Sequence, residues 1–154
     1  NIASIYSCQG DDIRVLEWYQ KALAIREKVL GKEHPDTAST YNSIAVVYAH
    51  QGDYTRALEW CQKALAIREK VLGKKHPDTA STYYSIAGIY DRQGNYTRAI
   101  EWYVKSLKIL MDQLGDNHPN TKTVRSNLKS AYLLNGGTKE AFGRWLMGQM
   151  NDSH

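Results

Sequence analysis

The sequence predicts an all-α, right-handed solenoid of helix pairs, and an internal repeat is the first reason. Residues 22–41 (ALAIREKVLGKEHPDTASTY) return 42 residues later as residues 64–83, with a single difference, Glu33 against Lys75. A weaker copy follows at the same spacing over residues 106–125. A fixed period of this length is typical of solenoids, in which each repeat buries its apolar face on its neighbours.

Helical periodicity is the second reason. Tyr41, Ile44, Ala45 and Tyr48 recur at i, i+3, i+4 and i+7, which places them on one face of a helix. The same kind of spacing along the chain predicts eight helices and no strands. We expect the helices at residues 1–9, 12–30, 35–50, 54–72, 77–92, 96–114, 119–134 and 138–150.

Short polar residues and glycines mark the expected helix ends. Asp11, Asp53 and Asn95 stand at equivalent positions before the second helices, where a side-chain acceptor satisfies free backbone N–H groups. Gly31, which recurs once per period, is expected to end a helix in the left-handed conformation. Pro35 suits the first turn of the next helix because its φ is fixed near the helical value.

The pattern describes one array of four repeats. We expect a truncated first repeat at residues 1–34, complete repeats at 35–76 and 77–118, and a divergent C-terminal capping repeat at 119–154. The last repeat has Arg125 and Lys129 where the previous one has Tyr83 and Ala87. Charges at core positions suit a cap whose outer face meets water. Because the chain opens with Asn1 inside an expected helix, we interpret it as a fragment of a longer array.

Composition argues against several classes of partner. The 154 residues include 20 basic and 16 acidic side chains, a net charge of +4 without a dense Lys/Arg run, so nucleic acid is not expected. Cys8 and Cys61 lie far apart and form no CxxC motif, which indicates a reducing compartment, and we expect a cytoplasmic protein. No bilayer-spanning apolar run or signal-peptide pattern is found, so no membrane partner is expected.

A family resemblance rests on matching positions of two near-identical repeats. These are Tyr41, Ile44, Ala45, Tyr48, Gly52, Tyr54, Ala57, Cys61 and Ala64, and then Tyr83, Ile86, Ala87, Tyr90, Gly94, Tyr96, Ala99, Tyr103 and Ser106. The set resembles the tetratricopeptide repeat (TPR) signature. The second helix continues through residues 68–72 into the connector LGKxHPDTA, which is similar to the 42-residue subclass found in kinesin light chains. The resemblance implies a superhelical solenoid of helix hairpins that binds proteins.

The resemblance also implies where a partner binds, because the first helix of each pair lines the concave face in this family. The candidate residues are Asn42, Val46, Ala49 and His50 on one first helix, Tyr84, Ser85, Gly88, Asp91 and Arg92 on the next, and Asn127 on the last. Repeats 17–58 and 59–100 differ at nine positions, and four of the nine lie in this stripe. Variation of one exposed stripe favours recognition, although simple drift of exposed positions is the alternative.

Two peptide-binding patterns of related repeats match only in part. Kinesin-light-chain-like repeats often carry paired asparagines on the first helix, which hold a peptide backbone through their amides. Here the pairs read Asn42-Ser43, Tyr84-Ser85 and Ser126-Asn127. Chaperone-binding members clamp a terminal carboxylate with Lys, Asn and Arg, and this chain lacks the first two at the corresponding positions. The difference argues against a chaperone-tail adaptor.

The recurrent histidines and tryptophans are interpreted as structural. His34, His76 and His118 each precede a proline, one repeat apart, so they are too distant to share a metal ion and we expect a connector role. The tryptophans Trp18, Trp60 and Trp102 are expected to pack between successive second helices.

No catalytic chemistry is indicated. Cys61 is expected to be a buried, inert thiol. The sequence contains no Ser/His/Asp set, no paired catalytic carboxylates and no phosphate-binding glycine loop, so we expect neither an enzyme nor a cofactor.

We therefore predict a module that binds a protein or peptide on its concave face. Two alternatives stay open: the repeats oligomerise or space other domains, or the array is the sensor arm of a larger signalling protein. Residues 1–9 lack the start of their helix, so apolar surface is expected to be unpaired there, which favours self-association through this end. A strictly monomeric species in light scattering at high concentration would contradict that alternative.

Overall fold

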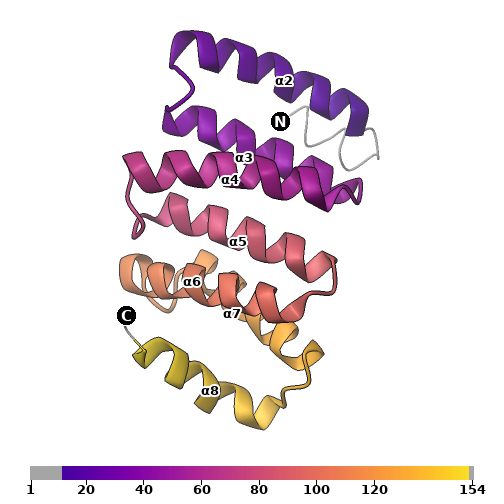
Figure 1. The fold of residues 1–154 in the computed structure, drawn as a ribbon. Coiled ribbons are helices and arrows are strands. Elements are labelled where there is room, and N and C mark those ends of the chain that lie inside the picture. Colours follow the sequence, from indigo (N-terminus) through magenta and orange to yellow (C-terminus); the bar gives the residue numbers. More distant parts are fainter. Residues whose placement is uncertain (1–11, 153–154) are drawn as a thin grey trace. The chain divides into compact units, whose positions relative to one another are not determined.

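The computed structural model describes residues 12–152, which contain seven α-helices and no strand (Figure 1). The helices are α2 (Asp12–Val29), α3 (Pro35–His50), α4 (Tyr54–Val71), α5 (Pro77–Arg92), α6 (Tyr96–Leu114), α7 (Pro119–Leu134) and α8 (Lys139–Asn151). Each begins and ends within one residue of the position expected from the sequence. The helix expected at residues 1–9 and the cap expected at Asp11 lie outside the described residues.

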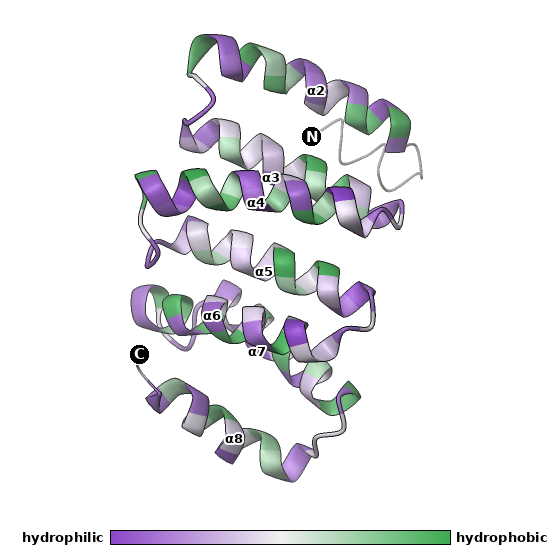
Figure 2. Cartoon of the chain, in the orientation of Figure 1, coloured by the Kyte–Doolittle hydropathy of each residue, from purple (hydrophilic) through white to green (hydrophobic). Residues whose placement is uncertain are grey.

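Contacts divide the chain into two compact units, Asn1–Lys74 and Lys75–His154. The first unit contains α2, α3 and α4, and the second contains α5, α6, α7 and α8. Polar and apolar residues alternate along each helix (Figure 2), as expected for helices that bury one stripe against a neighbour. Within each unit, helices that follow one another in the sequence pack together.

The core of the first unit lies around α3. Ala38, Tyr41 and Ile44 of this helix are buried in one cluster with Leu23 of α2 and Ala64 of α4. The small alanines let helix backbones approach closely, and the larger side chains fill the remaining gaps. The expected core role of Tyr41 and Ile44 is confirmed.

The core of the second unit is centred on α6. Ala99, Tyr103 and Leu107 of this helix are buried together with Ala87 of α5 and Leu128 of α7. The buried residues of α6 therefore serve the packing of both neighbouring helices.

Two tryptophans of the second helices form ring contacts with tyrosines of the first helices. The Trp60 ring lies 5.5 Å from the ring of Tyr41, and the Trp102 ring lies 5.6 Å from that of Tyr83. Trp60 and Trp102 thus contact the first helix of their own repeat, and packing between successive second helices stays a prediction. Trp18 is half exposed.

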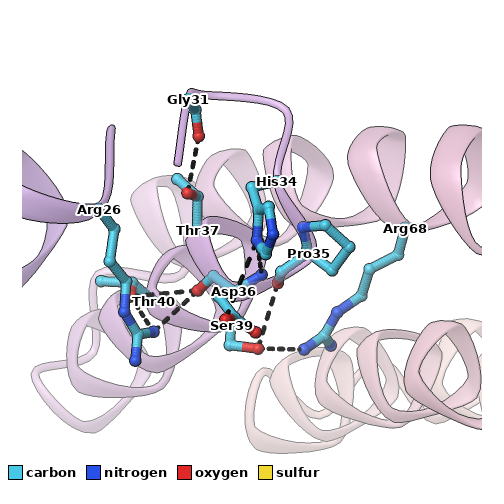
Figure 3. A network of polar contacts seen from close by, with 9 residues as sticks. All are labelled: Arg26, Gly31, His34, Pro35, Asp36, Thr37, Ser39, Thr40 and Arg68. Carbon is cyan, nitrogen blue, oxygen red and sulfur yellow. Dashed lines mark hydrogen bonds and ion pairs between the residues drawn. The ribbon is translucent and has the colours of Figure 1, made fainter. Parts of the chain in front are cut away.

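The connector between α2 and α3 is fixed by its own hydrogen bonds (Figure 3). Gly31 has a φ of +93°, a conformation that a glycine adopts without steric cost, and its carbonyl accepts a 2.8 Å bond from the Thr37 hydroxyl. His34 caps α3, because its Nδ1 accepts the backbone N–H of Asp36 at 3.0 Å. His76 and His118 cap α5 and α7 in the same way. The expected connector role of the histidines is confirmed.

Two arginines tie α3 to its neighbours in the first unit (Figure 3). Arg26 of α2 donates 2.8 Å bonds to the Asp36 carbonyl and to the Thr40 hydroxyl. Arg68 of α4 is buried and donates to the Ser39 hydroxyl at 3.0 Å. The bonds to the Thr40 and Ser39 hydroxyls are part-buried and satisfy polar groups that packing partly removes from water, whereas the bond to the Asp36 carbonyl is exposed.

The last helix, α8, packs on α7 through aromatic residues near the turn that joins them. Phe142 is buried, and the Tyr132 ring lies 5.4 Å from Phe142 and 4.7 Å from Trp145. At the positions where a repeat normally carries core residues, the Lys129 ammonium lies over the Phe142 ring and Arg125 pairs with Asp116. The charged residues of α7 are therefore accommodated at its surface, consistent with the interpretation of a capping repeat.

The connector geometry predicts a stability effect for Thr37→Val. Valine has nearly the same shape but cannot donate to the Gly31 carbonyl, so we expect unfolding in urea to show a loss of about 1 kcal/mol. Thr55→Val at an exposed position of α4 is the matched control, with an expected change below about 0.5 kcal/mol. Equal stability of the two variants would contradict the role of this hydrogen bond.

Candidate peptide-binding surface

The candidate residues on α3 divide into exposed and buried positions. Val46 is 42% exposed, and His50 is exposed at the last residue of the helix. Asn42 is half-buried, with its Oδ1 4.0 Å from the Cys61 sulfur of α4. Ala49 is buried, so its expected exposure is wrong. The physical reason is that Ala49 lies one turn after the fully buried Ala45 and therefore on the same side of the helix.

On the second unit, Tyr84 and Asn127 meet. The Asn127 side-chain amide of α7 donates to the Tyr84 hydroxyl of α5 at 2.5 Å. The two helices are first helices of successive repeats, so this bond links the candidate residues across the pair. Tyr84 also packs against Tyr103 of α6, with ring centroids 5.8 Å apart.

Asp91 is held by the same cluster. The Tyr103 hydroxyl donates to the Asp91 carboxylate at 3.1 Å. Burial raises the pKa of the Tyr103 phenol, and the Asp91 charge and hydrogen bond raise it further, so the phenol stays protonated at neutral pH and keeps donating. Tyr84, Tyr103, Asp91 and Asn127 thus form one connected cluster, which we call the tyrosine cluster.

The remaining candidates on α5 are Ser85, Gly88 and Arg92. Gly88 has open space around it, since an added Cβ would meet no atom within 4 Å. Ser85 donates its hydroxyl to the Ser81 carbonyl of its own helix at 3.1 Å, and Arg92 is exposed at the last residue of α5. Gly88 of α5 is the equivalent of the exposed Val46 of α3, so α5 has no side chain one turn after Tyr84.

A pocket of about 210 Å³ adjoins Tyr84 in the second unit. It lies between α5, α6 and α7 and is lined by Pro77, Ser81, Tyr84, Ser106, Leu110, Asn120, Thr123 and Val124. The stripe drawn from the sequence missed Ser81 and Thr123. Helical spacing could have predicted both residues. Ser81 precedes Tyr84 by three residues and Thr123 precedes Asn127 by four, so each lies one turn from a candidate residue on the same face of its helix.

In residues 12–152, no group of three or more His, Cys, Asp and Glu side chains is placed to hold a metal ion. The three connector histidines cap three different helices. Among the described helices, none combines the length and apolar character needed to cross a membrane.

These features define a helical-repeat scaffold, and comparison identifies its family. The tetratricopeptide repeat pattern matches residues 1–59, 37–112 and 86–144. The chain therefore belongs to the tetratricopeptide repeat family, whose repeats generally mediate protein–protein interaction. A search of curated proteins found no match.

Solved structures of similar fold confirm the expected all-α solenoid of TPR helix hairpins. A Podosopora anserina protein described as kinesin light chain, with nearly identical TPR-like repeats, has a TM-score of 0.80 at 24% identity over 99% of this chain and 74% of its own. A point variant of that protein has a TM-score of 0.80 at 27% identity over 97% and 69%. BtubC (BKLC) from P. vanneervenii has a TM-score of 0.79 at 22% identity over 99% and 63%. The resemblance to kinesin-light-chain-like repeats is thus confirmed in the fold.

Burial of Cys61 beneath Asn42 predicts an unreactive thiol. Burial raises the pKa of the Cys61 thiol to about 12, although the charge of Arg68 acts in the opposite direction. At pH 8 we expect a Cys8→Ser variant, whose single thiol is Cys61, to react with Ellman's reagent about a thousandfold more slowly when folded than in denaturant. Rapid labelling of the folded variant would contradict the burial of this side chain.

Proposed function

We propose that this chain is a protein-interaction module that binds an extended peptide segment of a partner on the face formed by its first helices, the concave face in this family. The observation that carries the proposal is the bond between Tyr84 and Asn127. It supports the proposal because it joins two candidate residues from separate first helices into one surface, as an extended segment lying across both helices requires.

The chemistry of the tyrosine cluster suits a peptide. The Asn127 amide uses one N–H for Tyr84, and its second N–H and its carbonyl oxygen match the donors and acceptors of a peptide backbone. The half-buried Tyr84 ring offers apolar area that costs little conformational entropy to order. Arg92 at the end of α5 adds positive charge, which favours an acidic residue in the partner. Binding rather than catalysis is the proposed activity, and the cytoplasm is the proposed compartment.

A comparison of two baits tests this function. Source lysate is passed over the native chain and over an Asn42→Ala, Tyr84→Ala, Arg92→Glu variant, and the retained proteins are identified by mass spectrometry. We expect at least one partner to be retained by the native chain and its retention to fall about tenfold or more on the variant, because each removed group belongs to the candidate surface of its own unit.

Two further variants control this comparison. Asn127→Ala removes the hydrogen-bond donor to Tyr84 without changing the aromatic side chains, and it is expected to weaken binding of the same partner. The second control combines Gln62→Ala and Lys75→Glu, which change only exposed positions. Lys75→Glu introduces the residue found at the equivalent Glu33, so this variant is expected to bind the partner normally.

Two outcomes would overturn the proposal. If every bait retains the same proteins, recognition does not use the first-helix stripe. If the baits retain only copies of themselves, the oligomerising function is favoured, and the exposed α2 residues Ile25 (63%) and Val29 (72%) are the apolar surface for it.

A further inference from the structure

The pocket beside Tyr84 exists because one repeat has a leucine where the others have an arginine. Leu110 of α6 occupies the position that is Arg68 in α4 and Arg26 in α2. In the first unit, the Arg68 guanidinium extends to the Ser39 hydroxyl at 3.0 Å. The equivalent serine of the second unit is Ser81, which lines the pocket together with Leu110. The shorter leucine side chain leaves unfilled the volume that a guanidinium occupies in the first unit.

A second difference accompanies the first. Arg26 donates to the hydroxyl of Thr40 at 2.8 Å, and the residue equivalent to Thr40 in the last repeat is Val124. Leu110 and Val124 are 4% and 3% exposed and both line the pocket. The polar pair Arg26–Thr40 between α2 and α3 therefore corresponds to the apolar pair Leu110–Val124 between α6 and α7. With leucine in place of arginine and valine in place of threonine, this site has an apolar lining where the first unit has hydrogen bonds.

We propose that this pocket is the specificity site of the module and receives one aliphatic side chain, of valine to leucine size, from the bound peptide. The inference rests on the proposed function, since the pocket opens beside Tyr84. The volume of about 210 Å³ is below the roughly 300–1,000 Å³ typical of sites for cofactors and drug-sized ligands and accommodates a single side chain.

The lining selects against a charged side chain. None of the residues that line the pocket carries a charge, and burying an ionised group there without a partner is strongly unfavourable. Pro77, Leu110 and Val124 supply the apolar contacts. Ser81 and Thr123 supply hydroxyls that suit the backbone on either side of the inserted residue.

Selection of peptides from a random display library tests the proposal. The baits are the native chain, a Leu110→Arg, Val124→Thr variant and a Ser81→Leu variant. The double variant introduces the equivalent of the Arg26–Thr40 pair that joins α2 to α3, so the new guanidinium has a hydroxyl partner. Ser81→Leu changes an exposed residue and obstructs the pocket without altering the core. Circular dichroism and thermal unfolding verify that both variants fold.

The native chain is expected to enrich peptides that share an aliphatic residue at one position. Alanine at that position is expected to weaken binding by about 10- to 100-fold, the effect of removing a buried aliphatic side chain. Both variants are expected to lose these peptides. Control peptides with Asp or Lys at the same position are expected not to bind the native chain.

The outcomes separate this inference from the function on which it rests. If the native chain enriches no peptide above the blank matrix, the proposed function fails. If it enriches peptides that share no aliphatic position, or that bind both pocket variants as well as the native chain, peptide binding stands and the specificity pocket is wrong.

Discussion

The connector between a second helix and the following first helix is the constraint on which the rest of the structure depends. A glycine in the left-handed conformation ends one helix, a histidine caps the next, and a buried threonine closes the turn by donating backward to a backbone carbonyl. In the first unit this donor is Thr37, and in the second it is Thr121, which donates to the Leu110 carbonyl at 3.4 Å. Because these bonds involve mostly backbone acceptors, the geometry survives changes of neighbouring side chains.

Because the connector geometry tolerates changes of neighbouring side chains, the repeats can differ in the residues that pack beside it. The arginine that anchors α3 in the first unit is replaced by a leucine in the second, while the connector of the second unit keeps its glycine, histidine cap and threonine. A scaffold held by local backbone bonds is free to exchange a buried polar pair for an apolar one, and here the exchange opens a pocket. Leu110 and Val124, the residues that differ, thus have side chains that the connector bonds do not use.

The helices and their ends followed from the sequence because period, caps and glycines all indicated the same structure. The candidate surface followed only in part. Ala49 was placed with the exposed stripe although it continues the buried row of Ala45, since small residues suit either side of a helix. The pocket could not be predicted, because it depends on how far the Leu110 side chain extends between α5, α6 and α7, which is set by the way these consecutive helices pack.

The tryptophans show the same limit. Their recurrence indicated a structural role, but the ring contact with the tyrosine of the first helix depends on the angle at which the two helices pack. Sequence spacing determines which residues share a face, whereas the partner on the opposite helix is set by tertiary packing.

The most direct measurement of the central claim is an NMR titration of the isotope-labelled chain with a peptide that binds it. If the first-helix face carries recognition, the backbone amides that shift belong to α5 and α7, around Ser81, Tyr84, Thr123 and Asn127. Shifts confined to exposed positions of the second helix α6, around Glu101 and Lys105, would contradict it.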